Sequence, residues 1–283
     1  MNLPKACIAA LVIALLMPGC SMSGASSGND GSGAGASGGG AGGPDPEGEL
    51  GGDDPGNGPT ADVNVIITAD NAYGFGYGTG DRLLNYFGGI ENLTADEIFS
   101  CPIGNGPEAY TVPARSANAG HYLYIVTYAD MAVTQGVLGQ FFREGAEPVF
   151  TGAGEWEVCA TGEDYDLGSH GPEIETINQH IASCSRGGLD EQTTSTGWVT
   201  TADSAHGKVV FGEANDTDRT TPLPGNEFPL VCDIDEEARW MWYEWDPDRS
   251  TGSPFLWPGG DQNVTKDFLI FRLGAEFIPE PPR

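Results

Sequence analysis

Short β-prone segments alternate with turn residues from residue 63 to residue 278, and this pattern restricts the fold more than any other feature. The segments are rich in Val, Ile, Thr, Tyr, Phe and Trp, whereas Gly, Pro, Asn and Asp fill the intervals between them. About ten strands at such short spacing are typical of a β-sandwich. The sequence therefore predicts an all-β fold, a single jelly-roll-like β-sandwich over residues 63–283, with strands at 63–68, 73–78, 121–128, 136–142, 155–160, 197–202, 208–211, 228–232, 238–243 and 268–273.

Two short helices are expected in insertions between the strands. Thr94 and Glu97 form a capping box ahead of a helix that reaches about residue 100. Pro172 suits the first position of a second helix, which the glycines at 187 and 188 would end. Apolar residues recur in this second segment at i, i+3, i+7 and i+10 and predict one buried stripe, formed by Ile174, Ile177, Ile181 and Cys184.

Residues 73–78 alternate an aromatic residue with glycine. On a strand the aromatic side chains share one face and the glycines share the other. We expect the aromatic row to pack in the core, with the glycines admitting either a neighbouring segment or a ligand. The segment lacks the glycine spacing and the following helix of a dinucleotide-binding loop.

The first 20 residues have the layout of an export signal. Lys5 precedes an apolar run over residues 6–17, which is too short to span a bilayer, and a small residue lies directly before Cys20. This layout resembles a bacterial lipoprotein signal, and the resemblance implies that residues 1–19 are removed and that Cys20 carries the lipid. Ser21 at the next position implies transport to the outer membrane. The alternative is an ordinary signal peptide with an incidental cysteine.

Residues 20–62 contain Gly, Ser, Ala, Asp, Pro and Glu with almost no large apolar side chain. Such a segment cannot bury enough surface to offset its ordering entropy. It is therefore predicted to be a disordered linker between the lipid on Cys20 and the β-domain. The protein would then be attached to a membrane of the bacterial cell envelope through its N-terminal lipid.

The chain is strongly acidic, with 41 Asp and Glu against 12 Lys and Arg and a formal charge of −29. This balance argues against nucleic-acid binding, which needs basic patches to displace counterions. It also argues against docking of the folded domain on anionic lipid. Solvation in salty surroundings and cation binding are both compatible with such acidity.

Outside the signal and Cys20, the cysteines are even in number, which predicts two disulfides in an exported chain. Three pairings are open. A zinc site is the alternative, but the sequence has no C-x-x-C or H-x-x-x-H spacing. The candidate disulfide residues are Cys101, Cys159, Cys184 and Cys232.

The densest aromatic cluster is the run 240–245. Trp240 and Trp242 share one face of a strand and are expected to anchor the core. Trp245 and Trp257 fall in loops, where flat aromatic rings can stack on the C–H faces of a sugar. The acidic side chains near them in sequence would hold the polar groups of the ligand, namely Asp246, Asp248 and Asp261.

The sequence contains no recognisable catalytic motif and no cofactor-binding motif. Acidic runs at 163–166, 216–218, 233–237 and 246–248 supply oxygen ligands, and none follows the twelve-residue EF-hand pattern. A structural Ca²⁺ in one of these loops is therefore an open alternative to plain solvation.

Two short stretches carry recognisable sequence patterns. Residues 67–74 (ITADNAYG) resemble the TAD hairpin of galactose-binding-like jelly-roll modules. Residues 238–243 (ARWMWY), with Phe271 and Arg272 further on, resemble the W-x-W and F-R pattern of modules attached to bacterial glycosidases such as α-L-rhamnosidases. The resemblance implies a β-sandwich first and sugar binding second.

Three functions are compatible with these features. The first expectation is a non-catalytic, ligand-binding lipoprotein of the cell envelope, with glycan as the ligand. The second is a structural role or the binding of a surface protein. The third is a glycan-degrading enzyme, which would need two carboxylates suitably spaced in a cleft.

Overall fold

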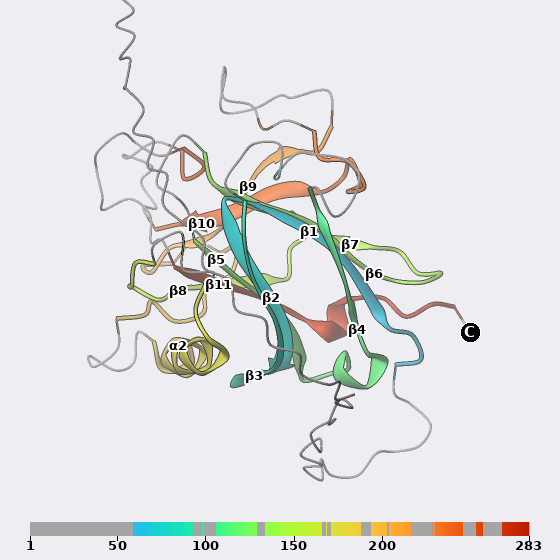
Figure 1. Cartoon of the computed structure of the whole chain (residues 1–283), viewed down its shortest axis with the longest axis horizontal. Coiled ribbons are helices and arrows are strands. Elements are labelled where there is room, and N and C mark those ends of the chain that lie inside the picture. The colour runs from blue at the N-terminus through green and yellow to red at the C-terminus, as the bar shows by residue number, and fades with distance from the viewer. Residues whose placement is uncertain are drawn as a thin grey trace, which may run out of the picture. The chain divides into compact units, whose positions relative to one another are not determined.

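The computed structural model describes residues 59–92, 98, 106–128, 134–165, 168, 171–187, 194–202, 204–216, 228, 230–245, 253–256 and 268–282. These residues belong to one compact unit that extends from Gly52 to Arg283. In this part of the chain the strands form two antiparallel sheets with a shared apolar core between them (Figure 1). The predicted all-β sandwich is therefore confirmed.

The first sheet has the strand order β4-β1-β6-β10-β9, and β7 pairs with β6 beside it. Its strands are β1 (Val63–Asp70), β4 (Glu108–Val112), β6 (Gly136–Arg143), β7 (Val149–Phe150), β9 (Lys208–Ala214) and β10 (Arg239–Glu244). The second sheet has the order β3-β2-β5-β11-β8. Its strands are β2 (Ala72–Thr79), β3 (Arg82–Glu91), β5 (His121–Tyr128), β8 (Trp156–Ala160) and β11 (Leu269–Gly274).

In the described part of the chain, consecutive strands often lie in different sheets, as β1 and β2, β5 and β6, and β10 and β11 do. In the first sheet β6 lies between β1 and β10, and in the second sheet β5 lies between β2 and β11. These pairings are antiparallel. Paired segments of the chain therefore wrap around a common core.

The aromatic row of β2 packs in the core between the sheets. Tyr73 and Phe75 are fully buried, and Tyr77 is nearly so. Trp240 and Trp242 of β10 are also buried, and the Trp242 ring lies 6.3 Å from the ring of Phe271 on β11. The predictions that β2 supplies a core aromatic row and that the two tryptophans anchor the core are confirmed.

The glycines of β2 allow β3 to approach closely. A Cβ placed on Gly76 would lie 2.5 Å from the carbonyl oxygen of Asn85, and one on Gly74 would overlap the side chain of Tyr86. The glycine face is thus filled by a neighbouring segment of the chain, which was one of the two expectations for it.

Helix α2 (Ile174–Arg186) packs on the outer face of the second sheet, beside β3 (Figure 1). It begins two residues after Pro172, and its buried side chains are Ile177, Ile181 and Cys184. The disulfide between Cys159 and Cys184 joins the helix to β8. Among the described residues, no helix is both long enough and apolar enough to cross a membrane.

The remaining helical and cysteine predictions are only partly covered. The helix predicted at 94–100 lies outside the described residues except at Ile98, which is helical and buried. Cys232 is held in a disulfide. Cys101 lies outside the described residues, so the second pairing stays a prediction. Two further short turns are 3-10 helices, η1 (Ala114–Ser116) and η2 (Ala275–Phe277).

The strand predicted at 197–202 is wrong. Val199 forms an isolated bridge with Val158, and Thr200 accepts a hydrogen bond from the amide of Val209. Gly197 has a φ of +80°, which interrupts the extended backbone ahead of this bridge. The segment therefore links β8 to β9 and covers that edge of the sandwich without forming a regular strand.

The strand predicted at 228–232 is also wrong for the described residues 228 and 230–232. The Phe228 ring stacks on Trp240 with 4.1 Å between the centroids. The backbone amide of Val231 donates to the side chain of Asn215 at 2.8 Å. The segment thus packs on the core through the Phe228 ring, and the Val231 backbone bonds to a side chain instead of to a neighbouring strand.

Candidate functional site

Of the side chains predicted to bind a ligand, Trp245 lies in the described part of the chain. It directly follows β10 and is 41% exposed, as a stacking residue requires. The other predicted residues lie outside the described part, and so does the lipidation residue: Trp257, Asp246, Asp248, Asp261 and Cys20. The site predicted around Trp257 therefore stays a prediction.

Among the described residues, no group of three or more His, Cys, Asp or Glu side chains is arranged to hold a metal ion. The acidic run 233–237 is described in full, and its four acidic residues are exposed to solvent around the buried Ile234. The run 246–248 lies wholly outside the described residues, and the runs 163–166 and 216–218 lie partly outside them. The structural Ca²⁺ stays a prediction for those runs.

A hollow of about 250 Å³ opens at one end of the second sheet, where β5 and β8 begin and β11 ends. We call it the aromatic hollow. Phe277 is 44% exposed and forms part of its wall. The other lining side chains used below are Tyr122, Glu155, Glu157, Thr200 and Glu276.

The strand register explains why these residues converge. Tyr122 pairs with Gly274 across β5 and β11, and Glu157 pairs with Arg272 across β8 and β11. Gly274 has no side chain, and a Cβ there would lie 2.9 Å from the carboxyl carbon of Glu276. The glycine therefore leaves room for the Glu276 carboxylate beside the end of β11.

Arg272 holds two members of the hollow in place. Its guanidinium carbon lies 4.6 Å from the ring centre of Tyr122 and 3.8 Å from that of Trp198. Its Nε donates to Glu157 Oε2 at 2.6 Å. A cation stacked between two rings and bonded to a carboxylate has little freedom left. Tyr122 and the Glu157 carboxylate are thus oriented before any ligand arrives.

The aromatic hollow carries excess negative charge. Arg272 is the basic side chain beside it, and Glu157 already pairs with that guanidinium. Glu155 and Glu276 are exposed, and neither has a cationic partner within the described part of the chain. Rings with adjacent carboxylates can contact both the C–H faces and the hydroxyl groups of a sugar.

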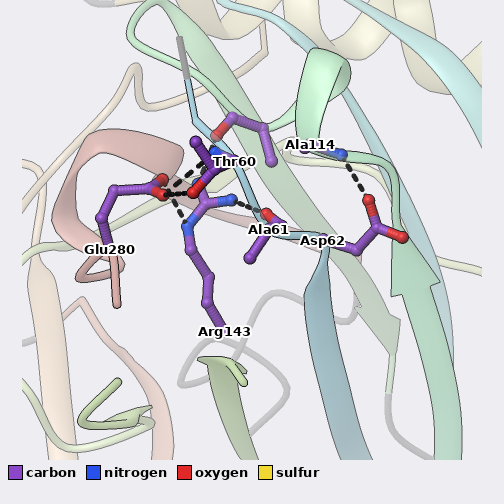
Figure 2. A network of polar contacts seen from close by, with 7 residues as sticks. Thr60, Ala61, Asp62, Ala114, Arg143 and Glu280 are labelled. Atoms are coloured by element: carbon purple, nitrogen blue, oxygen red, sulfur yellow. Dashed lines mark hydrogen bonds and ion pairs between the residues drawn. The ribbon is translucent and has the colours of Figure 1, made fainter. Parts of the chain in front are cut away.

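A second hollow, of about 200 Å³, lies on the other side of the segment that follows β11. We call it the clasp hollow. Arg143 is fully buried in its wall, and its Nε lies 2.9 Å from Glu280 Oε1. Figure 2 shows the Arg143 and Glu280 side chains pointing toward each other next to Thr60 and Ala61.

We call the Arg143–Glu280 ion pair the clasp, and it joins the two ends of the described domain. Arg143 also donates to the carbonyl oxygens of Ala61 and Ala117, and Glu280 accepts from the amide of Thr60 at 3.2 Å (Figure 2). Two nitrogens of the guanidinium thus donate to carbonyl oxygens and the third forms the ion pair with Glu280, which offsets the cost of burying the charge. The geometry indicates a structural role for Arg143.

Glu108 differs from the carboxylates of the hollows because it forms a hydrogen bond with a buried core residue. The hydroxyl of Tyr73 donates to Glu108 Oε2 at 2.6 Å, and the Tyr110 hydroxyl lies 3.1 Å from that of Tyr73. Burial raises the pKa of Glu108, and the Tyr73 hydrogen bond opposes the rise. Burial also raises the pKa of Tyr110 to about 12.

Sequence reasoning missed the aromatic hollow. Tyr122 lies in a predicted strand, and strand alternation places Arg272 on the face opposite Phe271. Most of the hollow is assembled from three segments that are far apart in the sequence, around residue 122, around residue 155 and over residues 272–277. Nothing in the sequence indicates that these segments meet. Phe277 follows a predicted strand, but no signal in the sequence shows that its ring is exposed.

No family model matches this chain, and comparisons with curated proteins and with solved structures find no significant similarity.

Proposed function

We propose that this chain is a non-catalytic, ligand-binding lipoprotein of the bacterial cell envelope, with glycan as its ligand. The lipid on Cys20 would hold the protein at the membrane, in the outer membrane given Ser21. The observation that carries the binding role is the aromatic hollow. It combines the exposed ring of Phe277 with the oriented pair of Tyr122 and Glu157.

The form of the hollow favours a sugar over a large apolar ligand. Its volume of about 250 Å³ lies below the range that is usual for drug-sized molecules. Its polar lining comes from carboxylates and Thr200, which accept hydrogen bonds from hydroxyl groups. A single sugar ring that stacks on Phe277 would use both kinds of contact.

Trp245 supports the same proposal from a second position. An indole that is 41% exposed at the end of a core strand can stack on a sugar while the strand keeps its backbone fixed. Trp245 and Phe277 are therefore the two aromatic residues to test for glycan contact.

The test is a glycan array probed with the detergent-solubilised full chain, with and without calcium. We expect saturable binding that Phe277→Ala removes while Tm changes by no more than about 2 °C, because the side chain is exposed. Leu230→Ala is the matched control, since Leu230 is 39% exposed and lines neither hollow. Binding that is lost only after chelation would place the ligand at the acidic loops instead.

A role in binding a surface protein is the second candidate, and one observation favours it. Leu84 and Phe87 are each 43% exposed on the edge strand β3. Exposed apolar residues on an edge strand can receive another chain. A blank glycan array, together with recovery of a cell-surface protein that Phe87→Asp abolishes, would favour this role over glycan binding.

A further inference from the structure

The aromatic hollow and the clasp hollow share one side chain. Glu276 lines both, and the segment 274–280 that follows β11 forms the wall between them. The first hollow receives Phe277 from this segment, whereas the second receives Pro279 and Glu280. A ligand that occupies the first hollow and continues past Glu276 would therefore reach the second.

The charges of the two hollows do not balance. Arg272 is paired with Glu157 beside the first hollow, and Arg143 is paired with Glu280 in the wall of the second. Each cation is thus matched by one carboxylate. Glu155 and Glu276 remain exposed without a cationic partner in the described part of the chain. Negative charge is therefore left over at Glu155 in the aromatic hollow and at Glu276, which lines both hollows.

We infer that the two hollows form one extended site for a linear glycan that carries free amino groups, with Glu276 binding an ammonium group at its centre. This inference rests on the proposed function. The exposed Phe277 ring provides a stacking surface for the C–H face of a sugar ring. The excess carboxylates select against uronic acids and sulfated sugars, because unpaired like charges repel across a binding surface.

The test is isothermal titration calorimetry of the full chain with three hexasaccharides at about pH 6. The probes are β-1,4-linked glucosamine, β-1,4-linked N-acetylglucosamine and α-1,4-linked galacturonic acid. In about 50 mM NaCl we expect the glucosamine hexamer to bind at least tenfold more tightly than the acetylated hexamer. This preference should shrink in about 500 mM NaCl, because salt screens exposed charges. The galacturonic acid hexamer should show no binding.

Chain length gives a second readout that does not depend on charge. If one ligand spans both hollows, the glucosamine hexamer should bind at least tenfold more tightly than the glucosamine monomer. Equal affinity per molecule for monomer and hexamer would overturn the extended site.

Glu276→Gln is the decisive variant. It should reduce the affinity for the glucosamine hexamer to that for the acetylated hexamer and leave the latter unchanged within twofold. Glu236→Gln is the matched control, because Glu236 is exposed and lines neither hollow. It should change neither affinity.

Each contrary result has its own meaning. Equal affinity for the two hexamers, or a preference that survives in Glu276→Gln, would overturn the inference. The inference would also be overturned if oligolysine displaced the glucosamine hexamer and bound more tightly than it, because the site would then be one for a cationic peptide. If another glycan binds in a Phe277-dependent manner while these hexamers fail, the inference falls and the proposed function stands. If no glycan shows Phe277-dependent binding, both fall.

Discussion

Glu157 and Arg272 face each other across β8 and β11, with 2.6 Å between Oε2 and Nε. The same guanidinium stacks on Tyr122 and Trp198, so one side chain of β11 connects β5 and β8 with the segment after α2. The aromatic hollow therefore has a wall whose polar and aromatic members are held by a single residue. Stability and ligand binding should both depend on it.

Arg272→Leu should lower the free energy of unfolding by about 2 kcal/mol, because it removes two ring contacts and leaves Glu157 without its partner. Arg272→Lys keeps the charge but loses the planar stack, so it should recover only part of this loss. Urea unfolding measures both changes. Arg115→Leu, at an exposed arginine, should cost less than about 0.5 kcal/mol. A lysine variant as stable as the natural protein would show that stacking contributes nothing.

The disulfide between Cys159 and Cys184 should stabilise the domain. It closes a loop with a sequence separation of 25 residues. Chain-entropy reasoning for such a loop predicts a contribution of about 3.5 kcal/mol. We expect the double variant Cys159→Ala with Cys184→Ala to lose about this amount in denaturant unfolding while its far-UV circular dichroism is retained. A loss below about 1 kcal/mol would mean that the packing of Ile177 and Ile181 alone holds α2 on the sheet.

Local patterns predicted the parts of this fold that depend on neighbouring residues in the sequence. The stripe of α2 placed Cys184 on the buried face, and the alternation in β2 placed Tyr73 and Phe75 in the core. β3 was missed because register shifts at Gly74–Gly76 and at Tyr77–Gly78 break its alternation. Bulges of this kind are set by the partner strand and leave no regular period in the sequence.

The candidate site depended on contacts that sequence patterns do not describe. Arg272 follows Phe271 in a predicted strand, yet its importance comes from Trp198, which lies in a segment wrongly predicted to be a strand. Phe277 lies just past β11, in the 3-10 turn η2. Its exposure follows from the way that turn leaves the sheet, which only the three-dimensional arrangement reveals.

Glu108 should make stability depend on pH. Its pKa is raised in the folded state, so the folded chain binds this proton more tightly than the unfolded chain does. Below the unfolded pKa of about 4.3, this tighter proton binding contributes nothing unfavourable to the free energy of unfolding. As the pH rises through the folded pKa, the buried carboxyl must ionise and the folded state loses stability. Glu108→Gln cannot ionise and still accepts the hydrogen bond from Tyr73. Its Tm advantage over the natural protein should therefore grow between pH 4.5 and pH 8.

The control for this pH dependence is Glu236→Gln, which alters an exposed carboxylate. Its Tm difference from the natural protein should stay nearly constant over the same pH range. An advantage of Glu108→Gln that is equally constant would show that ionisation of Glu108 does not limit stability.

Arg143 and Glu280 should be unequal partners in the clasp (Figure 2). Arg143 is fully buried and bonds to two carbonyl oxygens besides Glu280, whose side chain is 42% exposed. Arg143→Met leaves those carbonyls without their donor and should lower the free energy of unfolding by about 3 kcal/mol. Glu280→Gln keeps an acceptor for Thr60 and for the guanidinium, so it should cost about 1 kcal/mol. Denaturant unfolding of the two variants measures this order, and a larger loss in Glu280→Gln would show that the ion pair outweighs the carbonyl bonds in joining the two ends of the domain.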